Sequence, residues 1–467
     1  MAVKFTDDQV MRATGATRVR KGARASYTAV CTDSRHLAKN SIFVALKGET
    51  FDGHNFVDAV GKAGADAVIV QRKHARAEAP KGVTVFEVDD TLAALGGLGR
   101  AWRKKFKFPI GAVTGSNGKT TTKELIAAIL STRGPVLKTS GNLNNEIGVP
   151  LTLFNLDDRQ VAGIVEMGMN HPGEIGCLTA IAQPDAGLIT IVQPAHLEGV
   201  GSIEGVASAK GELFKGLRGS ALAVVNLDDE RIVEQAKLSG AKTLTWGRAA
   251  LAQVRLVKTE PHGREGLAIT IRYKGVDYPI ALRLIGDHNA MNATGAFALA
   301  IALGYSPEEC VRGLEAAQAH ARRLQVLEAP GGVTVVDDCY NANPASMKAA
   351  LEALGGLAIE GRPIAVLGDM LELGRDELKA HEQMGVNASD LAQRVAFFGT
   401  RMKAAYNVAT KKLKRNAAHF DKVELLVDWL KNDLAKGDVV LVKGSRGMKL
   451  ERVVDALTGK PSSAGGH

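Results

Sequence analysis

The chain has 467 residues, of which 45% are apolar and 23% charged, a balance typical of globular proteins and unlike that of disordered or fibrous ones. One hydrophobic core rarely grows to this size, so we expect two or three domains. The net charge of +9 favours anionic ligands such as nucleotides, but the basic residues are scattered and aromatic residues make up only 5%, which argues against nucleic-acid binding.

The cysteines and the N-terminus indicate a cytoplasmic protein. Cys31, Cys177, Cys310 and Cys339 are far apart and form no Cys-x-x-Cys pair, so we expect neither a disulfide framework nor a zinc site. The N-terminus lacks the apolar stretch of a signal peptide, and no run of about 18 apolar residues occurs, so no integral membrane segment is expected.

The first predicted domain covers residues 1–108. An apolar run at 41–46 is followed by a glycine-containing turn and by a second unit at 56–70. These segments alternate the signals of strands and helices, which indicates a small α/β domain. Pro109 then marks the boundary before the next strand.

The central domain is predicted at 109–321. It begins with a buried strand at 110–114, a glycine loop and an amphipathic helix at 123–130. Strands that alternate with helices predict a mostly parallel sheet covered on both faces. Further strands of this sheet are expected at 161–165, 187–192 and 221–225.

The third predicted domain, 322–467, repeats this alternation, which indicates an open, Rossmann-like sheet. Its last seven residues, 461–467, are small or polar and are predicted to be disordered. Strands of the domain are expected at 333–336, 364–367, 395–398 and 439–442.

A glycine loop between the first strand and helix of the central domain predicts phosphate binding. Backbone N–H groups and a helix N-terminus surround an anion in such a loop. Lys119 can reach the β- and γ-phosphates, and the Thr120 hydroxyl can bind Mg²⁺. Val113 replaces the usual first glycine, and a chance turn is the alternative reading. The predicted ATP-binding residues of this loop are Gly115, Ser116, Asn117, Gly118, Lys119, Thr120 and Thr121.

We therefore predict an α/β protein of three domains, with a central P-loop-type ATPase domain. The loop, the segment 141–150 and the segment 166–170 resemble, in this order, the Mur ligase family of peptidoglycan synthesis. The resemblance implies an ATP-dependent ligase that forms an amide through an acyl phosphate. The segments 367–374 and 442–447 are most similar to members that join D-alanyl-D-alanine to a UDP-sugar peptide, so these substrates and a monomeric enzyme are expected.

Other functions remain open at this point. A related ligase could add a single amino acid, or glutamates to folate. A P-loop ATPase of another class would be expected to have the longer loop and a strand that ends in a Walker-B aspartate. A nucleotide-binding regulatory module without chemistry is a third alternative.

Besides Thr120 of the glycine loop, three residues of the central domain are predicted to serve magnesium chemistry. Glu166 follows an apolar strand, so its carboxylate should project from the end where open sheets bind ligands, and such an oxygen suits Mg²⁺. The resemblance adds His196, although imidazole is an unusual partner for this ion. It also implies that Lys210 carries a carbamate that helps to hold a second Mg²⁺, whereas the residue alone favours a solvated helix lysine. The predicted metal ligands are Thr120, Glu166, His196 and Lys210, and the predicted catalytic residues are Lys119, His196 and Lys210.

The resemblance also implies which residues bind the adenine, the γ-phosphate and the ribose of ATP. It places His288, Asn289 and Asn292 beside the adenine, although Asp287 or Asn289 could instead cap a helix at 293–302. It places an arginine at the γ-phosphate and Asp338 at the ribose. The family commonly has Gly-Arg where this chain has Arg322-Arg323, so we choose Arg323 on its following leucine and leave Arg322 open.

Substrate binding is predicted on all three domains. Ser34 and Arg35 lie in a segment that resembles the UDP-sugar region and could reach a phosphate or a carboxylate, although Asp33-Ser34 could be a simple turn. The segment 51–54 resembles the same region. The other predicted substrate-binding residues are Asn142, Asn144, Asn145, Tyr340, Asn341 and Asn343.

Overall fold

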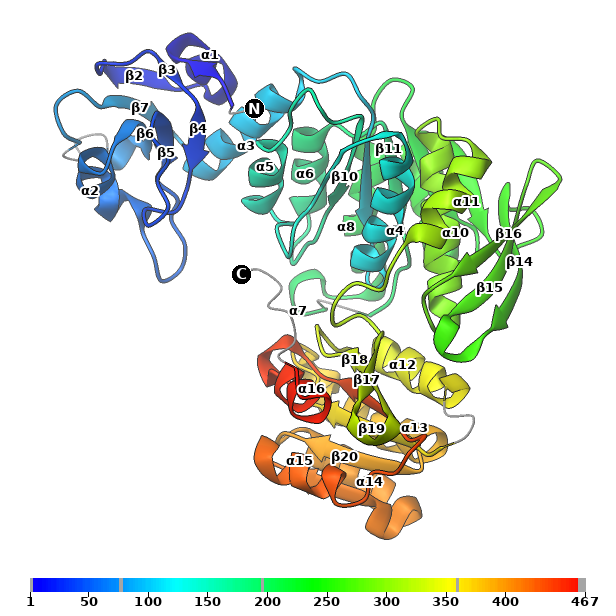
Figure 1. The fold of residues 1–467 in the computed structure, drawn as a ribbon. Helices are drawn as coiled ribbons and strands as arrows, with labels where there is room; N and C mark the ends of the chain where they lie inside the picture. Colours follow the sequence, from blue (N-terminus) through cyan, green and yellow to red (C-terminus); the bar gives the residue numbers. More distant parts are fainter. Residues whose placement is uncertain (1–2, 75–78, 195–196, 358–360, 461–467) are drawn as a thin grey trace.

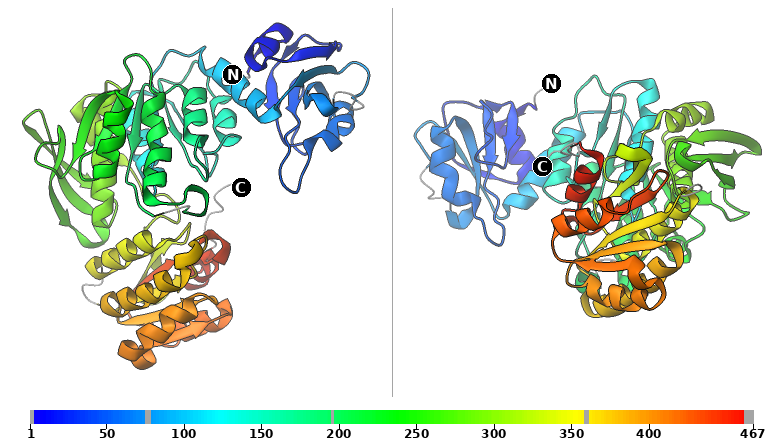
Figure 2. Two further views of the ribbon diagram at one scale, coloured as in Figure 1. Left: turned by 180° about the vertical axis from the view of Figure 1, so that it is seen from behind. Right: turned by 60° about the horizontal axis from the view of Figure 1, so that its bottom comes forward.

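The computed structural model describes residues 3–74, 79–194, 197–357 and 361–460. These residues form three large sheets, each in its own part of the molecule (Figure 1). The N-terminal and C-terminal parts lie on different sides of the central one in every view (Figures 1 and 2). None of the helices in these ranges is long and apolar enough to cross a membrane. The predicted disordered tail, 461–467, lies outside the described residues.

The N-terminal sheet has the strand order β2-β7-β6-β5-β4, and only β2 runs antiparallel to its neighbour. Its central strands are buried on both faces, because Ile42 and Val44 pack into one core and Phe43 into another. The small α/β architecture predicted for this region is confirmed. The elements are β1 (Phe5–Thr6), α1 (Asp7–Thr14), β2 (Thr17–Arg20), β3 (Ser26–Tyr27), β4 (Ala29–Cys31), β5 (Ser41–Val44), α2 (Val57–Lys62), β6 (Ala65–Gln71) and β7 (Thr84–Val88).

Helix α3 (Thr91–Arg103) connects this sheet to the central part (Figure 1). Two glycines let it approach both neighbours closely. A Cβ atom on Gly97 would collide with the carbonyl oxygen of Ala13 in α1, and one on Gly99 would lie 3.0 Å from Cα of Pro150. A single hydrophobic core consequently continues from the N-terminal sheet past α3 into the central part.

The central sheet has the order β16-β15-β14-β13-β12-β11-β8-β10-β9. The predicted parallel sheet is confirmed from β9 to β14, with β8 between β10 and β11. The strands are β8 (Ile110–Thr114), β9 (Val136–Lys138), β10 (Ala162–Glu166), β11 (Ala186–Ile189), β12 (Leu222–Asn226), β13 (Lys242–Gly247), β14 (Val254–Pro261), β15 (Leu267–Tyr273) and β16 (Val276–Leu282).

The antiparallel extension β14-β15-β16 was not predicted. Leu267, Ile269 and Ile271 of β15 are buried, whereas the residues between them are partly exposed, because only one face of this hairpin packs on the core. Its alternation of apolar and polar residues differs from the continuous apolar runs of the parallel strands.

Helices cover both faces of the central sheet, as predicted (Figure 2). Consecutive residues of β8 point to opposite faces, so Ala112 packs into the core beneath α6 and α8, and Val113 into the core beneath α4 and α10. The helices are α4 (Lys119–Leu130), α5 (Gly148–Leu153), α6 (Glu174–Ala182), α7 (Leu197–Val200), α8 (Ile203–Gly216), α9 (Glu230–Ser239), α10 (Asp287–Ala302) and α11 (Pro307–Ala316).

The C-terminal sheet has the order β17-β18-β22-β19-β20-β21, and all neighbours are parallel except β17 and β18. This arrangement confirms the open α/β sheet predicted here. The elements are β17 (Gln325–Ala329), β18 (Val333–Asp338), α12 (Pro344–Leu357), β19 (Pro363–Gly368), α13 (Glu377–Leu391), β20 (Arg394–Phe398), α14 (Met402–Leu413), β21 (Ala417–Phe420), α15 (Val423–Lys431), β22 (Val439–Lys443) and α16 (Glu451–Thr458).

Candidate active site

The predicted phosphate loop lies between β8 and α4, and two glycines are required by its geometry. Gly115 and Gly118 have φ angles of 151° and 80°, which side chains rarely allow. A Cβ atom on Gly115 would collide with Oγ1 of Thr190, and one on Gly118 would collide with Oδ1 of Asn292. Gly118 also precedes the first residue of α4, so the loop opens directly onto a helix N-terminus.

Hydrogen bonds fix the loop to the segment after β11. The backbone N–H of Ser116 donates to the carbonyl of Ile191 at 2.8 Å, and the Ser116 hydroxyl donates to the carbonyl of Gln193 at 2.8 Å. The Thr190 hydroxyl donates to the carbonyl of Asn117 at 2.5 Å. These contacts hold the backbone in place before any ligand binds, because each joins the loop to the neighbouring strand end.

Lys119 lies at the first position of α4. Its Nζ donates to the carbonyl of Gly115 at 2.8 Å, which bends the side chain back over the loop. Burial lowers the pKa of Lys119, attraction by Glu166 raises it, and repulsion by Arg323 lowers it. Two cations from different domains therefore face the space beside this loop.

Glu166 ends β10 and is buried. Its Oε1 accepts a hydrogen bond of 3.0 Å from Nδ2 of Asn144, and its backbone N–H donates to Oγ1 of Thr139 at 2.9 Å. Its Oε2 has no hydrogen-bond partner among the described residues, and its nearest cation is Lys123, whose Nζ lies 4.0 Å away. An oxygen buried in this way is suited to a ligand that brings positive charge.

The sequence analysis did not identify Lys123. This lysine is almost fully buried, and its Nζ donates to the carbonyl of Thr139 at 2.8 Å and lies 2.9 Å from Oε1 of Glu124. It follows Lys119 by four residues, so both lie on one face of α4. That spacing was the available signal.

Lys210 lies on α8 and is buried, with 1% of its surface exposed. Burial lowers its pKa well below the usual lysine value, and repulsion by Lys119 lowers it further. Within the described ranges it makes no hydrogen bond or ion pair, so nothing there compensates a charge on this amine. His196, the other predicted catalytic residue of this region, lies outside the described residues.

The predicted adenine element forms the start of α10. The helix begins at Asp287, and Gly286 at its N-cap makes no side-chain capping bond, so the alternative that Asp287 or Asn289 caps the helix is wrong. Nδ2 of Asn289 instead donates to the carbonyl of Ile285 at 2.8 Å, which occupies this side chain inside the first turn.

Asn292 links this element to the phosphate loop. Its Nδ2 donates to Oδ1 of Asn289 at 2.9 Å, and its Oδ1 accepts from the hydroxyl of Thr122 at 3.3 Å. Burial lowers the pKa of His288, whereas Asp338 of the C-terminal part raises it. The start of α10 lies close to the C-terminal part, because a Cβ atom on Gly286 would lie 3.3 Å from Cβ of Ala353 in α12.

The C-terminal part reaches the phosphate loop through Arg323. Its Nη2 donates to Oγ1 of Thr120 at 3.2 Å, and its guanidinium lies 4.0 Å from the ring centroid of Tyr340. Arg322 points elsewhere, with Nη1 4.0 Å from Oε1 of Glu451. Arg322 and Leu324 have φ angles of 63° and 51°, so two left-handed residues flank the arginine that approaches the loop.

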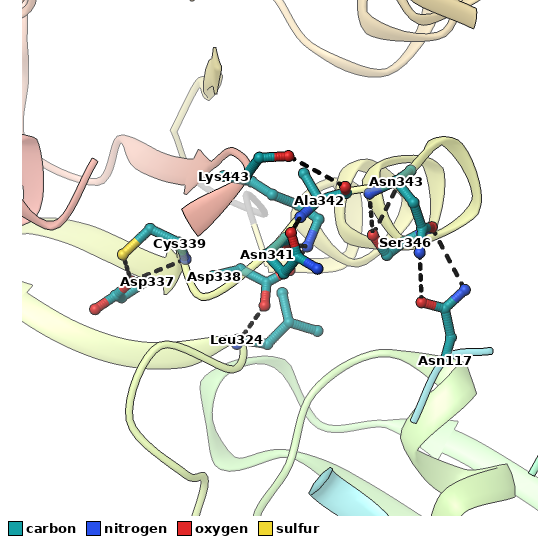
Figure 3. Close-up of polar contacts among 11 residues, drawn as sticks. Asn117, Leu324, Asp337, Asp338, Cys339, Asn341, Ala342, Asn343, Ser346 and Lys443 are labelled. Carbon is teal, nitrogen blue, oxygen red and sulfur yellow. Dashed lines mark hydrogen bonds and ion pairs between the residues drawn. The ribbon is translucent and has the colours of Figure 1, made fainter. Parts of the chain in front are cut away.

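A pair of amides forms a second bridge between these parts (Figure 3). Nδ2 of Asn343 donates to Oδ1 of Asn117 at 2.8 Å, and Nδ2 of Asn117 lies 3.4 Å from Oδ1 of Asn343. Asn343 also precedes α12 and accepts from the backbone N–H of Ser346 at 2.9 Å. The predicted substrate residue Asn343 thus contacts the phosphate loop itself.

Asp338 ends β18 beside this bridge (Figure 3). Its Oδ2 accepts a hydrogen bond of 2.6 Å from Nζ of the buried Lys443, and its Oδ1 accepts from the backbone N–H of Leu324 at 3.2 Å. Lys443 also donates to the carbonyl of Asn341 at 3.0 Å. The carboxyl ends of β18 and β22 are joined by this buried ion pair.

The remaining predicted substrate residues make local contacts. Arg35 donates from Nη2 to Oδ2 of Asp33 at 2.7 Å, and this bond is the main reason that the pKa of Asp33 lies well below its usual range. The Arg35 backbone N–H also bonds Asp33, so Ser34 lies within a turn. Asn145 accepts from the N–H of Gly148 at the start of α5, while Asn142 accepts from the N–H of Asn144.

A separate cluster of possible metal ligands lies in the N-terminal part. The ligating atoms of Asp52, His54 and His74 lie within 4.8 Å of one another. Nδ1 of His54 lies 2.6 Å from Oδ1 of Asp52, and its Nε2 accepts from the backbone N–H of Gln71 at 3.1 Å. Both ring nitrogens of His54 are occupied, so this histidine fixes the local fold.

Comparison with known proteins agrees with this geometry. The family model described as "Mur ligase family, catalytic domain" matches residues 26–103, "Mur ligase middle domain" matches 113–300, and "Mur ligase, glutamate ligase domain" matches 322–446. The chain belongs to the Mur ligase family.

Two curated relatives share one enzyme name, and two solved structures of MurF match almost the whole chain. The chain is 38% identical to UDP-N-acetylmuramoyl-tripeptide--D-alanyl-D-alanine ligase of Bacillus subtilis, over 93% of this chain and 94% of that one, and 36% identical to the enzyme of the same name from Escherichia coli, over 94% and 95%. A crystal structure of MurF from Acinetobacter baumannii matches with a TM-score of 0.89 at 32% identity, over 98% of this chain and all of that one. MurF ligase from Thermotoga maritima in complex with ADP matches with a TM-score of 0.82 at 28% identity, over 92% and 97%.

Proposed function

We propose that this protein is an ATP-dependent ligase that joins D-alanyl-D-alanine to a UDP-N-acetylmuramoyl-tripeptide through an acyl phosphate. The observation that carries this function is the contact of Arg323 with Thr120, because it brings a C-terminal cation onto the phosphate loop of the central part. A ligase of this kind needs such closure, since water would hydrolyse an acyl phosphate. The relatives that match almost the whole chain have this activity in their names.

In this proposal the nucleotide spans the bridge between the central and C-terminal parts. Residues 115–121 hold the phosphates through backbone N–H groups, and Lys119 and Arg323 face the γ-phosphate. The amides of Asn289 and Asn292 and the ring of His288 face the adenine, and Asp338 accepts from the ribose. The bonds of Asn292 to Asn289 and Thr122 support this assignment, because they join the adenine and phosphate elements.

The residues at the end of β10 fit a magnesium ion. Glu166 would hold it through its unpartnered Oε2, Thr120 through its hydroxyl, and His196 is the further ligand that the sequence suggested. When bound, Mg²⁺ supplies positive charge to the oxygens of the transferred phosphoryl group. Asn144 keeps Glu166 oriented through the bond to its other oxygen.

Lys210 is proposed to carry a carbamate. Its buried, poorly charged amine can attack the carbon of CO₂, so that an N–C bond forms and a proton leaves to solvent. The product is an anion where the unmodified side chain would be a cation near Lys119. The modified Lys210 would then serve as a ligand for a second Mg²⁺.

The reaction has two bond-making steps. A carboxylate oxygen of the tripeptide attacks the γ-phosphorus, and the bond from this phosphorus to the bridging β-phosphate oxygen breaks to form ADP, which leaves later. The dipeptide amine then attacks the acyl carbon, loses a proton, and expels phosphate as the amide forms. Lys119 and Arg323 stabilise charge on the transferred phosphoryl group, and closure of the C-terminal part excludes water.

Substrate contacts and organisation complete the proposal. The UDP-sugar end is assigned to Ser34 and Arg35, which requires that Arg35 exchange its bond to Asp33 for the ligand. The proposed domains are 1–108, 109–321 and 322–467. The protein is proposed to be a monomer and to be located in the cytoplasm. The acceptor side is assigned to Asn142, Asn144, Asn145, Tyr340, Asn341 and Asn343.

An ADP-release assay with a panel of amines tests the function. We expect release only with the UDP-sugar tripeptide and D-alanyl-D-alanine together, and little with D-alanine or glutamate. Release that is equally fast without either substrate would refute the ligase assignment. Release with a single amino acid in preference to the dipeptide would identify a different member of the family.

A further inference from the structure

The segment after β22 contributes a cation that the proposed mechanism does not use. Residues 444–450 connect β22 to α16, and two bonds fix Ser445 within this segment. Its backbone N–H donates to the carbonyl of Asp369 at 3.1 Å, and its Oγ accepts from the backbone N–H of Leu371 at 2.9 Å. This segment therefore lies at the carboxyl edge of the C-terminal sheet, where β19 and β22 end.

That edge faces the phosphate loop. The bond from Asn343 to Asn117 starts in the segment after β18, at the carboxyl edge of this sheet (Figure 3). The bond from Arg323 to Thr120 starts just before β17, which pairs antiparallel with the end of β18. Ser445 also lies 3.4 Å from the carbonyl of Ala342, the residue before Asn343. A ligand that binds at residues 444–450 would consequently be close to the transferred phosphoryl group.

Arg446 is the cation available on this segment. Its Nη1 donates to Oε1 of Glu451 at 2.9 Å, and the same oxygen lies 4.0 Å from Nη1 of Arg322. Its side chain is 49% exposed, and in the described part of the chain its other nitrogens bond no residue. Glu451 thus holds the guanidinium at the edge and leaves donors free for a carboxylate.

Three other cations of this region already have partners. Lys443 is paired with Asp338, Arg323 with the phosphate loop, and Arg401 with Glu377 at 2.8 Å. The incoming dipeptide has an amine that reacts and a carboxylate at its other end. That carboxylate needs a positive partner a few ångströms from the acyl phosphate, on the side of the C-terminal sheet.

We propose that Arg446 binds the C-terminal carboxylate of the acceptor dipeptide and so determines specificity for an acceptor with a free carboxyl end. The inference rests on the proposed function, because it takes the dipeptide as the second substrate. Charge-assisted bonds from an arginine fork change affinity by about 10- to 100-fold, so the free acid should be preferred over the uncharged amide by this factor.

The test compares D-alanyl-D-alanine with its C-terminal amide as acceptors. In the Arg446→Leu enzyme we expect kcat/KM for the acid to fall about 10- to 100-fold, with the amide rate nearly unchanged and the KM for ATP preserved. Arg446→Lys should keep part of the preference, because it retains a point charge. Arg415→Leu, an exposed arginine before β21 at the opposite edge of the sheet, is the matched control.

The following outcomes would contradict the assignment of the carboxylate site to Arg446. An equal loss with acid and amide in both Arg446 variants would refute the inference, as would a preference for the acid that survives Arg446→Leu. Loss of the preference in Lys449→Met, with Arg446→Leu unaffected, would move the carboxylate site to Lys449. If the wild-type enzyme couples neither the dipeptide acid nor its amide but uses another amine, the proposed function itself is wrong. This outcome is seen in the wild-type enzyme alone, so it is distinguished from a failure of the Arg446 inference.

Discussion

Replacement of Lys443 by methionine isolates the buried ion pair that joins β18 and β22. The Nζ to Oδ2 distance is 2.6 Å, and the lysine and aspartate side chains are only 3% and 11% exposed. Removing the cation leaves the Asp338 carboxylate buried, and within the described ranges its remaining donor is the N–H of Leu324. Loss of one partner of a buried pair costs about 3–5 kcal/mol. We therefore expect the C-terminal part of Lys443→Met to be destabilised by this amount.

Hydrogen exchange measured by mass spectrometry can follow this loss locally. Peptides from β18 and β22 should exchange about 100- to 1000-fold faster in Lys443→Met, whereas peptides from β8 should be unchanged. Asp338→Asn in the same chain removes the stranded charge and should restore most of the protection. Exchange within about fivefold of wild type would refute this account of the pair.

Other predictions concern single side chains. Lys119→Ala should lower kcat at least about 100-fold, because it removes positive charge at the phosphoryl group, and near-normal turnover would contradict the loop assignment. Burial and, after it, the bond to Glu146 raise the pKa of Cys177 to about 12, so this thiol should be alkylated at pH 8 at least about 100-fold more slowly than a free cysteine, and Glu146→Gln should speed the reaction. Burial lowers the pKa of His288, so the unfolded chain binds this proton first as pH falls below about 6.5, and native stability is lost there. His288→Gln should remove that loss. The free energies of unfolding of wild type and variant can be measured in urea at about pH 7.5 and 5.5, and a difference between the two proteins that is the same at both pH values would contradict the reasoning.

Local patterns were sufficient for the parallel strands. The apolar runs that predicted β8, β10 and β22 are continuous because these strands are buried on both faces, and Glu166 at the end of β10 could be anticipated for the same reason. The hairpin β14-β15-β16 was not predicted, because one of its faces is exposed and polar residues interrupt its apolar runs.

Contacts between distant segments could not be read from the sequence. Asn117 and Asn343 are separated by 226 positions, so the local sequence around either residue does not predict their hydrogen bond. The same holds for Lys443 and Asp338, whose pairing depends on the neighbouring positions of β18 and β22. Arg35 was expected to face a ligand, but its partner Asp33 is two residues away, and only the turn geometry reveals that the local pair forms. The ligand roles of these residues remain predictions.

The glycines of α3 also decide which parts of this enzyme can move. Gly97 touches the backbone of α1 and Gly99 touches Pro150 of α5, so α3 is in close backbone contact with a helix of each neighbouring part. The N-terminal and central parts should consequently behave as one platform. Opening and closing would then fall to the C-terminal part alone. Among the described residues, this part contacts the phosphate loop through Arg323 and the amide pair, and it also packs against Ile285 before α10. In the proposed function, the UDP-linked substrate would then stay on the fixed N-terminal and central parts, and only the C-terminal part, which contains Arg446, would move.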